Sequence, residues 1–216
     1  MKMECIGIFG GTFNPIHNGH LALAQTVLDT LHCTQIRFVP AALPPHKTAP
    51  AVTAQHRAAM VKLAIQAHPQ YVLDSCELDR QGPSYTIETL HLLRQRFPEQ
   101  SLCLLIGQDS YQQLPTWHRW QELLEYCHLL VVHRADLASR LVLHAEHTEK
   151  FVAIEAFASQ CAAATHGFIG YLPESPPAIS STGIRAALAH PGQNLTDQLP
   201  ASVLQYIQQH HLYQSA

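Results

Sequence analysis

The sequence predicts an α/β fold built on a doubly wound, mainly parallel sheet. Short, continuously apolar runs recur along the 216 residues, and stretches of helical periodicity separate them. Continuous apolarity is typical of strands that a parallel sheet buries on both faces. Strand and helix alternate, as they do in a right-handed array of βαβ units. We therefore expect helices on both faces of the sheet.

Five apolar runs bounded by turn signals are predicted strands. They cover residues 5–9, 36–39, 102–106, 129–132 and 168–172. Their order along the chain, with helical stretches between them, indicates a Rossmann-like arrangement.

Helical periodicity is clearest in residues 20–32, "HLALAQTVLDTLH", and 53–68, "TAQHRAAMVKLAIQAH", where Thr53 is placed to cap the second helix. A third helix, "YTIETLHLLRQRF", opens at Ser84 and closes at Pro98. The tail "LPASVLQYIQQHHLY" reads as an amphipathic helix, so we expect a C-terminal helical segment, about 182–213, packed on the body. Residues 134–165 show no clear element boundaries. Without a repeat or a linker, we expect one domain over residues 1–216.

The composition narrows the class of protein. Hydrophobic residues make up 47% and charged residues 13%, which is typical of a globular chain with a core. No apolar run reaches the roughly 18 residues of a membrane span, and the start lacks a signal-peptide pattern, so we expect a cytoplasmic protein. A net charge of −3 gives no footprint for nucleic acid. The six cysteines are scattered without a C-x-x-C pair, which indicates buried thiols in a reducing compartment.

The first candidate site follows the first predicted strand, in the stretch "GGTFNPIHNGH". Ligands of open parallel sheets bind beyond the carboxyl ends of the strands, where Gly10 and Gly11 would let a phosphate approach the backbone. The stretch matches neither G-x-G-x-x-G nor a Walker loop. His17 and His20 are three residues apart, so at a helix start they share one face and can meet phosphate oxygens. The alternative is that both are polar turn residues.

Two segments at opposite ends of the chain resemble the nucleotidyltransferase superfamily. "GGTFNPIHNGH" is similar to its H-x-G-H signature, and "ISSTGIR", residues 179–185, is similar to its I-S-S-T-x-x-R segment. Ser181 and Thr182 would place hydroxyls at a helix start, and Arg185 one turn later could reach the same anion from the other side.

Four internal segments resemble the bacterial nicotinate-nucleotide adenylyltransferases, and the resemblance covers nearly the whole chain. They are "PAALPPHK" at 40–47, "GPSYT" at 82–86, "IGQDS" at 106–110 and "LPTWHRW" at 114–120. The residues alone leave alternatives open. His46 and Lys47 suit a substrate phosphate or form an exposed basic turn, and Asp109 is a hydrogen-bond acceptor for ligand or a helix cap. Trp117 can stack on a pyridinium ring or belong to the core.

The resemblance implies transfer of AMP from ATP to the 5′-phosphate of nicotinate mononucleotide, which yields nicotinate adenine dinucleotide and pyrophosphate in NAD biosynthesis. It implies that His17, His20 and Arg185 are catalytic. The implied ATP-binding residues are Gly10, Gly11, Thr12, Phe13, His17, His20, Gly107, Asp109, Ser181, Thr182 and Arg185. The implied mononucleotide-binding residues are His46, Lys47, Tyr85, Thr86, Trp117 and the His118 backbone, whereas Trp120 is structural. Mg²⁺ would arrive with ATP, without a protein metal cage.

Rival functions differ in the segments that they explain. Phosphopantetheine adenylyltransferase shares both end motifs but is a shorter chain without "PTWHRW". Cytidylyltransferases share H-x-G-H, but the middle segments do not fit them. A non-catalytic nucleotide-binding protein could lose His17, His20 and Arg185, which are intact here. Asn14 stands where an aspartate is also common in the family, so no essential carboxylate chemistry is assigned to it. Nicotinate is favoured over nicotinamide on the resemblance alone, and an oligomer is compatible with the sequence.

Overall fold

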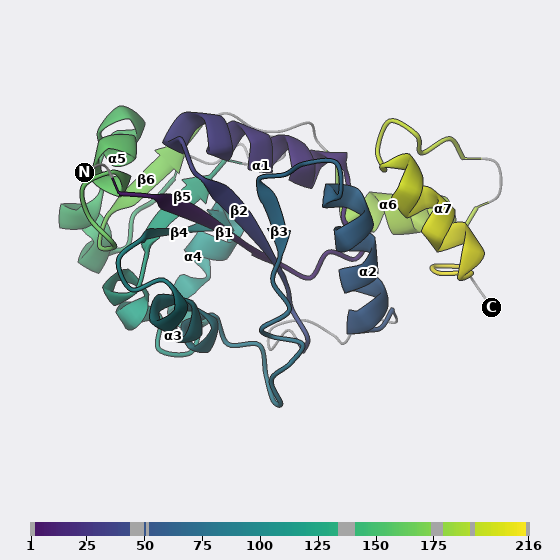
Figure 1. The fold of residues 1–216 in the computed structure, drawn as a ribbon, viewed down its shortest axis with the longest axis horizontal. Helices are drawn as coiled ribbons and strands as arrows, with labels where there is room; N and C mark the ends of the chain where they lie inside the picture. Colours follow the sequence, from purple (N-terminus) through teal and green to yellow (C-terminus); the bar gives the residue numbers. More distant parts are fainter. Residues whose placement is uncertain are drawn as a thin grey trace.

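A six-stranded, all-parallel sheet forms the centre of the molecule (Figure 1). The computed structural model describes residues 3–43, 50, 52–133, 141–173, 179–190 and 193–214. The strands are β1 (Cys5–Gly11), β2 (Gln35–Pro40), β3 (Tyr71–Leu73), β4 (Ser101–Gly107), β5 (His128–Val132) and β6 (Ile169–Leu172). Their order across the sheet is β3-β2-β1-β4-β5-β6, which is the doubly wound order of Rossmann folds. The predicted fold class is therefore confirmed.

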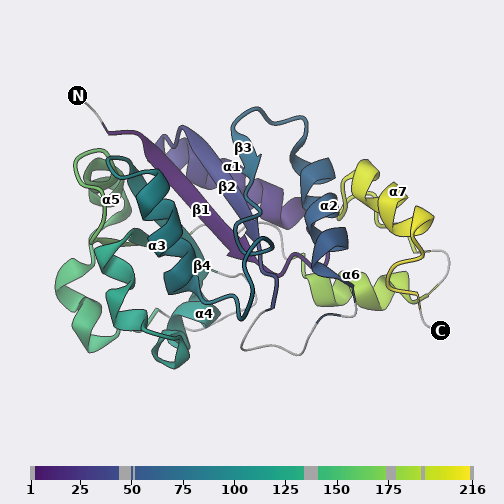
Figure 2. The same cartoon turned by 60° about the horizontal axis from the view of Figure 1, so that its bottom comes forward.

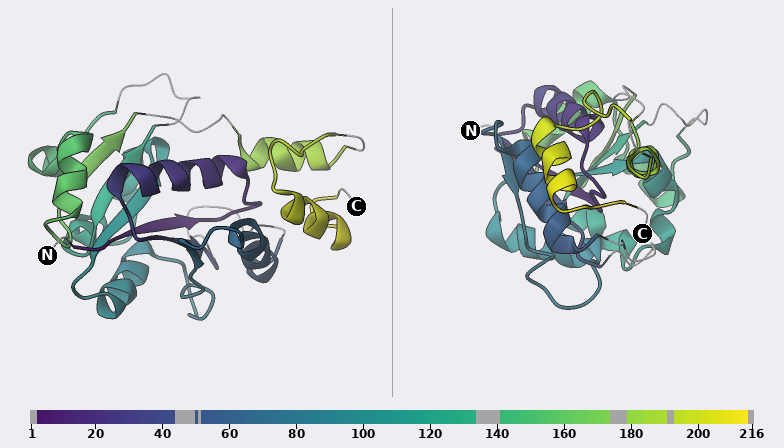
Figure 3. Two further views of the ribbon diagram at one scale, coloured as in Figure 1. Left: turned by 45° about the horizontal axis from the view of Figure 1, so that its top comes forward. Right: turned by 90° about the vertical axis from the view of Figure 1, so that its right-hand side faces the viewer.

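Helices cover both faces of this sheet. They are α1 (Asn18–Leu31), α2 (Ala54–Ile65), α3 (Thr86–Arg96), α4 (Gln108–Gln112), α5 (Ile154–Cys161), α6 (Ser181–Leu188) and α7 (Ala201–Gln209). Three short 3₁₀ helices are η1 (Leu114–Thr116), η2 (Trp120–Glu125) and η3 (Ala145–Lys150). The purple α1 lies on one side of the sheet and the teal α3 on the other, as the left view of Figure 3 shows. The α5 helix shares the α1 face, and α4 and η2 share the α3 face.

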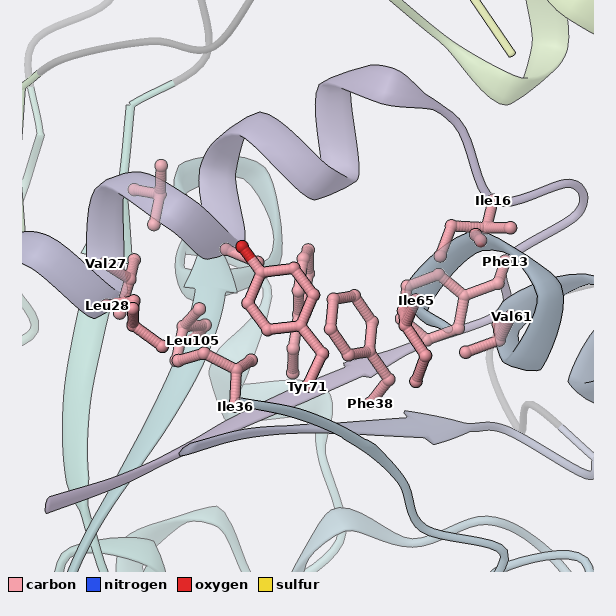
Figure 4. Close-up of a cluster of buried hydrophobic side chains, with 14 of the residues drawn as sticks. Phe13, Ile16, Val27, Leu28, Ile36, Phe38, Val61, Ile65, Tyr71 and Leu105 are labelled. Carbon is pink, nitrogen blue, oxygen red and sulfur yellow. The ribbon is translucent and has the colours of Figure 1, made fainter. Parts of the chain in front are cut away.

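Two apolar clusters follow from the alternation of side chains along each strand. In β4, Leu105 faces α1 and Leu104 faces α3, and both are buried. Figure 4 shows the α1 side, where Phe38 lies between Phe13 and Tyr71. Side chains on both faces of the central strands are therefore buried.

The structure adds one strand and corrects one helix start. All five predicted strands are present, but β3 was not predicted because its three residues give no periodic signal. Thr53 caps α2 as predicted, since its hydroxyl accepts the His56 N–H. The prediction that Ser84 opens α3 is wrong, because the N-cap is Tyr85. The Ser84 hydroxyl instead accepts the Ala42 and Leu43 N–H groups, at 2.9 and 3.2 Å, and so ties the end of β2 to α3.

The C-terminal helices lie beyond the carboxyl ends of the strands, as Figure 2 shows for β1 and the yellow-green α6 and α7. Helix α7 packs on α2, where the Ser202 hydroxyl donates to the Leu63 carbonyl and Tyr206 contacts His56 Nδ1 at 2.9 Å. The N-terminus lies at the opposite end of the molecule (Figure 1). The C-terminal helices thus lie at the edge of the sheet where β1 ends.

All six cysteines fall within the described residues, where each is buried and none forms a disulfide. Among the helices of these residues, none combines the length and the apolarity that crossing a bilayer requires.

Candidate active site

His17 and His20 form a stacked pair where α1 begins. His17 is the N-cap of α1, with an extended backbone and a buried side chain, and His20 is the third residue of the helix. Their ring centroids are 3.7 Å apart at an interplanar angle of 27°. The His17 N–H donates to His20 Nδ1 at 3.2 Å, so a neutral His20 ring carries its proton on Nε2, where it is a donor. The first turn of α1 contains no acidic residue, which favours an anion there.

The glycine between the histidines is closely packed. A Cβ on Gly19 would lie 3.1 Å from His17 Nδ1 and 3.4 Å from Ile179 Cβ. A side chain at this position would therefore push the His17 ring aside by a few tenths of an ångström. Gly10 differs, because a Cβ there would meet no atom within 4 Å, so its backbone faces open space that a ligand could occupy.

Phe13 packs against the His20 ring from the side of the apolar core. Its side chain is buried in the α1-face cluster, edge-on to the His20 ring at 5.1 Å and to the Phe9 ring at 5.6 Å. The backbone of Phe13 has a φ of +46°, a left-handed conformation. The structure therefore places the Phe13 ring against His20 rather than at the surface of the site.

Helix α6 docks on the loop that precedes the histidines. Arg185 Nη1 donates to the Asn14 carbonyl at 2.9 Å, and the Ser181 hydroxyl donates to the Pro15 carbonyl at 3.0 Å. Arg185 Nη2 also donates to the Thr182 hydroxyl at 3.2 Å. The two end motifs of the sequence, 166 residues apart at Pro15 and Ser181, thus meet. Together they gather a guanidinium, two hydroxyls and two imidazoles around one helix N-terminus.

A cavity of about 250 Å³ opens on the α3 side of the same loop. Its walls bring together seven of the predicted binding residues, namely Gly10, Gly11, Thr12, Tyr85, Thr86, Trp117 and His118. The Tyr85 and His118 rings are 4.5 Å apart. Trp117 is half-buried at this wall, whereas Trp120 is buried and packs on His144 and His147. The two tryptophans therefore occupy different environments, one at the cavity and one in the core.

The segment "IGQDS" places Gly107 at the carboxyl end of β4, next to β1 in the sheet. Asp109 is exposed in the first turn of α4. The N-cap of α4 is Gly107, without a side-chain cap, so the interpretation of Asp109 as a helix cap is wrong. His46 and Lys47 lie outside the described residues.

Two buried charged residues near the cavity were not predicted. Glu77 lines the cavity, and its Oε1 accepts the Thr89 hydroxyl at 2.7 Å. Burial raises the pKa of the Glu77 carboxyl, while hydrogen bonds from Thr89 and Ser84 act in the opposite direction. Arg57 is 1% exposed on α2. Arg57 precedes the buried Met60 and Val61 by three and four residues, so it lies on the apolar face of α2. A charged residue on such a face is the sequence signal that could have identified Arg57.

Within the described part of the chain, no group of three or more His, Cys, Asp or Glu side chains is arranged to hold a metal ion. The donors that surround the histidine pair are cations, hydroxyls and N–H groups, which suit phosphate oxygens rather than Mg²⁺.

Comparisons with known proteins show the family of the chain. The Cytidylyltransferase-like family model matches residues 8–187. Two relatives named "Probable nicotinate-nucleotide adenylyltransferase", from Marinomonas sp. (strain MWYL1) and Aeromonas salmonicida (strain A449), are 41% and 43% identical. The alignments cover 99% and 97% of this chain, and 96% and 97% of the relatives. The chain is also similar in fold to the Plasmodium falciparum nicotinic acid mononucleotide adenylyltransferase complexed with NaAD, with a TM-score of 0.71, 16% identity and 97% of each chain covered.

These matches span both end motifs and the cavity segments between them, and the chain belongs to the nicotinate-nucleotide adenylyltransferase family, within the wider Cytidylyltransferase-like family.

Proposed function

We propose that this chain carries out the reaction of its family, the transfer of AMP from ATP to the 5′-phosphate of nicotinate mononucleotide. The products are nicotinate adenine dinucleotide and pyrophosphate, on the route to NAD. One observation carries the proposal. The loop after β1 has a cluster of histidines, hydroxyls and Arg185 on one side and the cavity of Trp117 on the other. One loop can therefore hold a triphosphate against a second, aromatic-lined site.

The histidine side suits ATP. His17, His20 and the N–H groups of the first turn of α1 would bind its phosphates, with His20 nearest the transferring group. Arg185, Ser181 and Thr182 would hold the β and γ phosphates that leave. Gly10, Gly11, Thr12, Gly107 and Asp109 would border the nucleotide along the edge of the sheet, and Phe13 would hold the His20 ring in place.

The cavity side suits the mononucleotide. The half-buried Trp117 indole offers a π-face to the cationic pyridinium ring. Tyr85, Thr86 and the His118 backbone, at the same wall, would hold the ring and its carboxylate. For His46 and Lys47, contact with the mononucleotide phosphate remains a proposal from sequence.

The mechanism follows from the charges. The attacking phosphate is already anionic, so the transfer needs no general base. Catalysis then rests on placing the phosphate oxygen in line with the α-phosphorus and on stabilising the charge that develops there. The histidine pair lies at the start of α1, and Arg185 contacts the loop that precedes it, so these side chains would supply such stabilisation. Mg²⁺ entering with ATP would take phosphate and water oxygens as ligands and neutralise part of the phosphate charge.

Two wider proposals accompany this function. We propose that residues 1–216 form one domain, because the C-terminal Leu199 and Val203 share an apolar cluster with α1 and α2. We also propose a cytoplasmic location, where ATP and the mononucleotide are available.

The decisive experiment supplies the purified chain with ATP and Mg²⁺ and with one acceptor at a time. Nicotinate mononucleotide, nicotinamide mononucleotide and phosphopantetheine are compared by pyrophosphate release, and the products are identified by mass spectrometry. We expect the highest kcat/KM with nicotinate mononucleotide. Turnover with phosphopantetheine alone, or ATP binding without any pyrophosphate release, would overturn the proposal. Preference for the amide would overturn only the choice of acceptor.

A further inference from the structure

We propose that Arg57 is a positioning residue that fixes the ATP-binding loop relative to the loop that leads to the mononucleotide site. The inference rests on the proposed function. The first loop is residues 12–17, after β1, and the second loop is taken as residues 41–43, after β2.

The guanidinium of Arg57 joins the two loops directly. Nη1 donates to the Thr12 carbonyl of the first loop at 2.6 Å, and Nη2 donates to the Ala41 carbonyl of the second loop at 2.6 Å. Longer contacts run from Nη2 to the Ala42 carbonyl at 3.3 Å and from Nε to the Val52 carbonyl at 3.4 Å. Because the guanidinium is planar and rigid, it holds these carbonyls in fixed directions. Thr12 and Ala41 both line the cavity. Arg57 therefore fixes the position of two parts of the cavity wall relative to each other.

The backbone N–H groups of the second loop also form hydrogen bonds. The Ala41 N–H donates to the Gly11 carbonyl at 2.9 Å, and the Ala42 N–H donates to the Ser84 hydroxyl at 2.9 Å. Arg57 therefore contacts the carbonyls of a segment whose N–H groups are already bound. Without Arg57, the segment would keep its hydrogen bonds to Gly11 and Ser84 but lose the contact that orients the Thr12 and Ala41 carbonyls toward each other.

The burial of Arg57 argues against a role in stability alone. Each of its hydrogen-bond partners in the described part of the chain is a backbone carbonyl. Burial lowers the pKa of Arg57, while electrostatic interactions with Tyr213 and Glu77 act in the opposite direction. Desolvating a cation is costly, and apolar side chains of similar volume often replace buried charges without loss of stability. A guanidinium here is better explained by the geometry that it imposes.

That geometry matters for an in-line transfer. The attacking oxygen must lie about 3–3.5 Å from the phosphorus, and a misplacement of about 1 Å can cost on the order of 100-fold in rate. ATP would lie on the first loop, and Ala41 of the second loop lines the cavity that we propose for the mononucleotide. Each loop can still bind its own substrate when their spacing changes. We therefore expect loss of Arg57 to lower kcat, while the affinity for each substrate alone stays nearly unchanged.

The experiment compares Arg57→Lys and Arg57→Gln with Arg94→Lys. Arg94 is a matched control because it also donates only to carbonyls among the described residues, those of Tyr126, Phe97, Pro98, Gln100 and Thr165. Burial lowers its pKa as well. It lies where β4 and β5 begin, at the sheet edge opposite the site.

For each variant we would measure Tm, kcat per folded enzyme, and the Kd of ATP and of nicotinate mononucleotide separately by calorimetry. We expect both Arg57 variants to lose about 10- to 100-fold in kcat, with each Kd within about threefold of the original. Lysine keeps the charge but cannot hold carbonyls of two loops in one plane, so Arg57→Lys should rescue little. Arg94→Lys should lower Tm and leave kcat unchanged.

Three results would overturn the inference. The first is an unchanged kcat in a folded Arg57→Lys with a lowered Tm, as in the control. The second is a tenfold weaker Kd for one substrate with an unchanged kcat. The third is a fall in kcat that Arg94→Lys reproduces. An original chain that releases no pyrophosphate would instead contradict the proposed function, so the two failures are distinguishable.

Discussion

The hydroxyl of Tyr213 donates to the Asn14 side-chain oxygen at 2.8 Å, across 199 residues of sequence. The Asn14 carbonyl accepts from Arg185, so one residue of the first loop is held by two elements from the end of the chain. Burial raises the pKa of the Tyr213 hydroxyl, which keeps it protonated and a donor at neutral pH. The loop that leads into the histidine pair is therefore anchored by the C-terminal segment.

Replacing this hydroxyl should weaken ATP binding. Tyr213→Phe removes one hydrogen bond, worth about 1 kcal/mol of stability, and leaves Asn14 less constrained where it meets Arg185. We expect a lower Tm and a KM for ATP raised a few-fold. Tyr71→Phe is the control, since its hydroxyl donates to Gln25 on α1 at 3.2 Å, away from the site. Equal kinetic effects of the two variants would refute a specific link between Tyr213 and the ATP site.

His20→Ala should remove a transition-state contact. Loss of one such donor typically costs about 10²–10³-fold in kcat, and we expect a loss of this size together with a lower Tm, because the variant also loses the acceptor of the His17 N–H. His91→Ala is the control, because His91 is exposed on α3 and contacts Gln95. Steady-state pyrophosphate release measures both. Near-normal turnover of His20→Ala would remove His20 from the mechanism.

Alanine substitutions at Gly19 and Gly10 should distinguish a glycine that is closely packed from one that faces open space. Gly19→Ala places a Cβ against the His17 ring and Ile179, so we expect it to lower both Tm and kcat. Gly10→Ala adds its Cβ to open space and should leave Tm unchanged but raise the KM for ATP. Thermal melts and kinetics on both variants test this contrast. An unaltered KM in Gly10→Ala would indicate that ATP does not approach that backbone.

The two tryptophans should respond in opposite ways. Trp117→Ala removes a ring at the cavity wall and should raise the KM for nicotinate mononucleotide more than tenfold with little change in Tm. Trp120→Ala empties a buried site beside His144 and His147, which should cost about 3 kcal/mol of stability. Chemical denaturation and acceptor titrations distinguish the two effects. Unchanged acceptor kinetics in Trp117→Ala would contradict stacking.

Glu77 should make stability depend on pH. Burial raises the pKa of its carboxyl above the ordinary value of 4.5. As the pH rises from 4.5 through the raised value, the unfolded chain releases this proton before the folded protein does, so this group lowers stability progressively over that window. Glu77→Gln removes the effect. The free energy of unfolding of the variant relative to the original should therefore increase with pH in that window and then level off, as urea denaturation at several pH values would show. A difference that stays constant from pH 4 to pH 8 would contradict this prediction.

The sequence predicted the long-range architecture better than the local contacts that complete the site. Continuous apolar runs identified five strands because burial on both faces leaves a plain pattern, whereas the three residues of β3 are too few to show one. Motif spacing brought His17 and Arg185 to one region. It could not show that Ser84 binds the second loop or which groups Arg57 binds, because the partners of both are backbone groups, which carry no sequence signature.

The anchoring of Asn14 by Tyr213 also has a consequence for the order of biosynthesis. The loop that holds the histidines leaves the ribosome's catalytic centre early, but its partner hydroxyl is added 199 residues later. At about 5–20 residues per second, that interval is on the order of 10 to 40 s. The sequence of β1 and α1 is therefore made long before the ATP loop is complete, and the newly made protein should reach its full affinity for ATP only when Tyr213 has been translated and docked on Asn14.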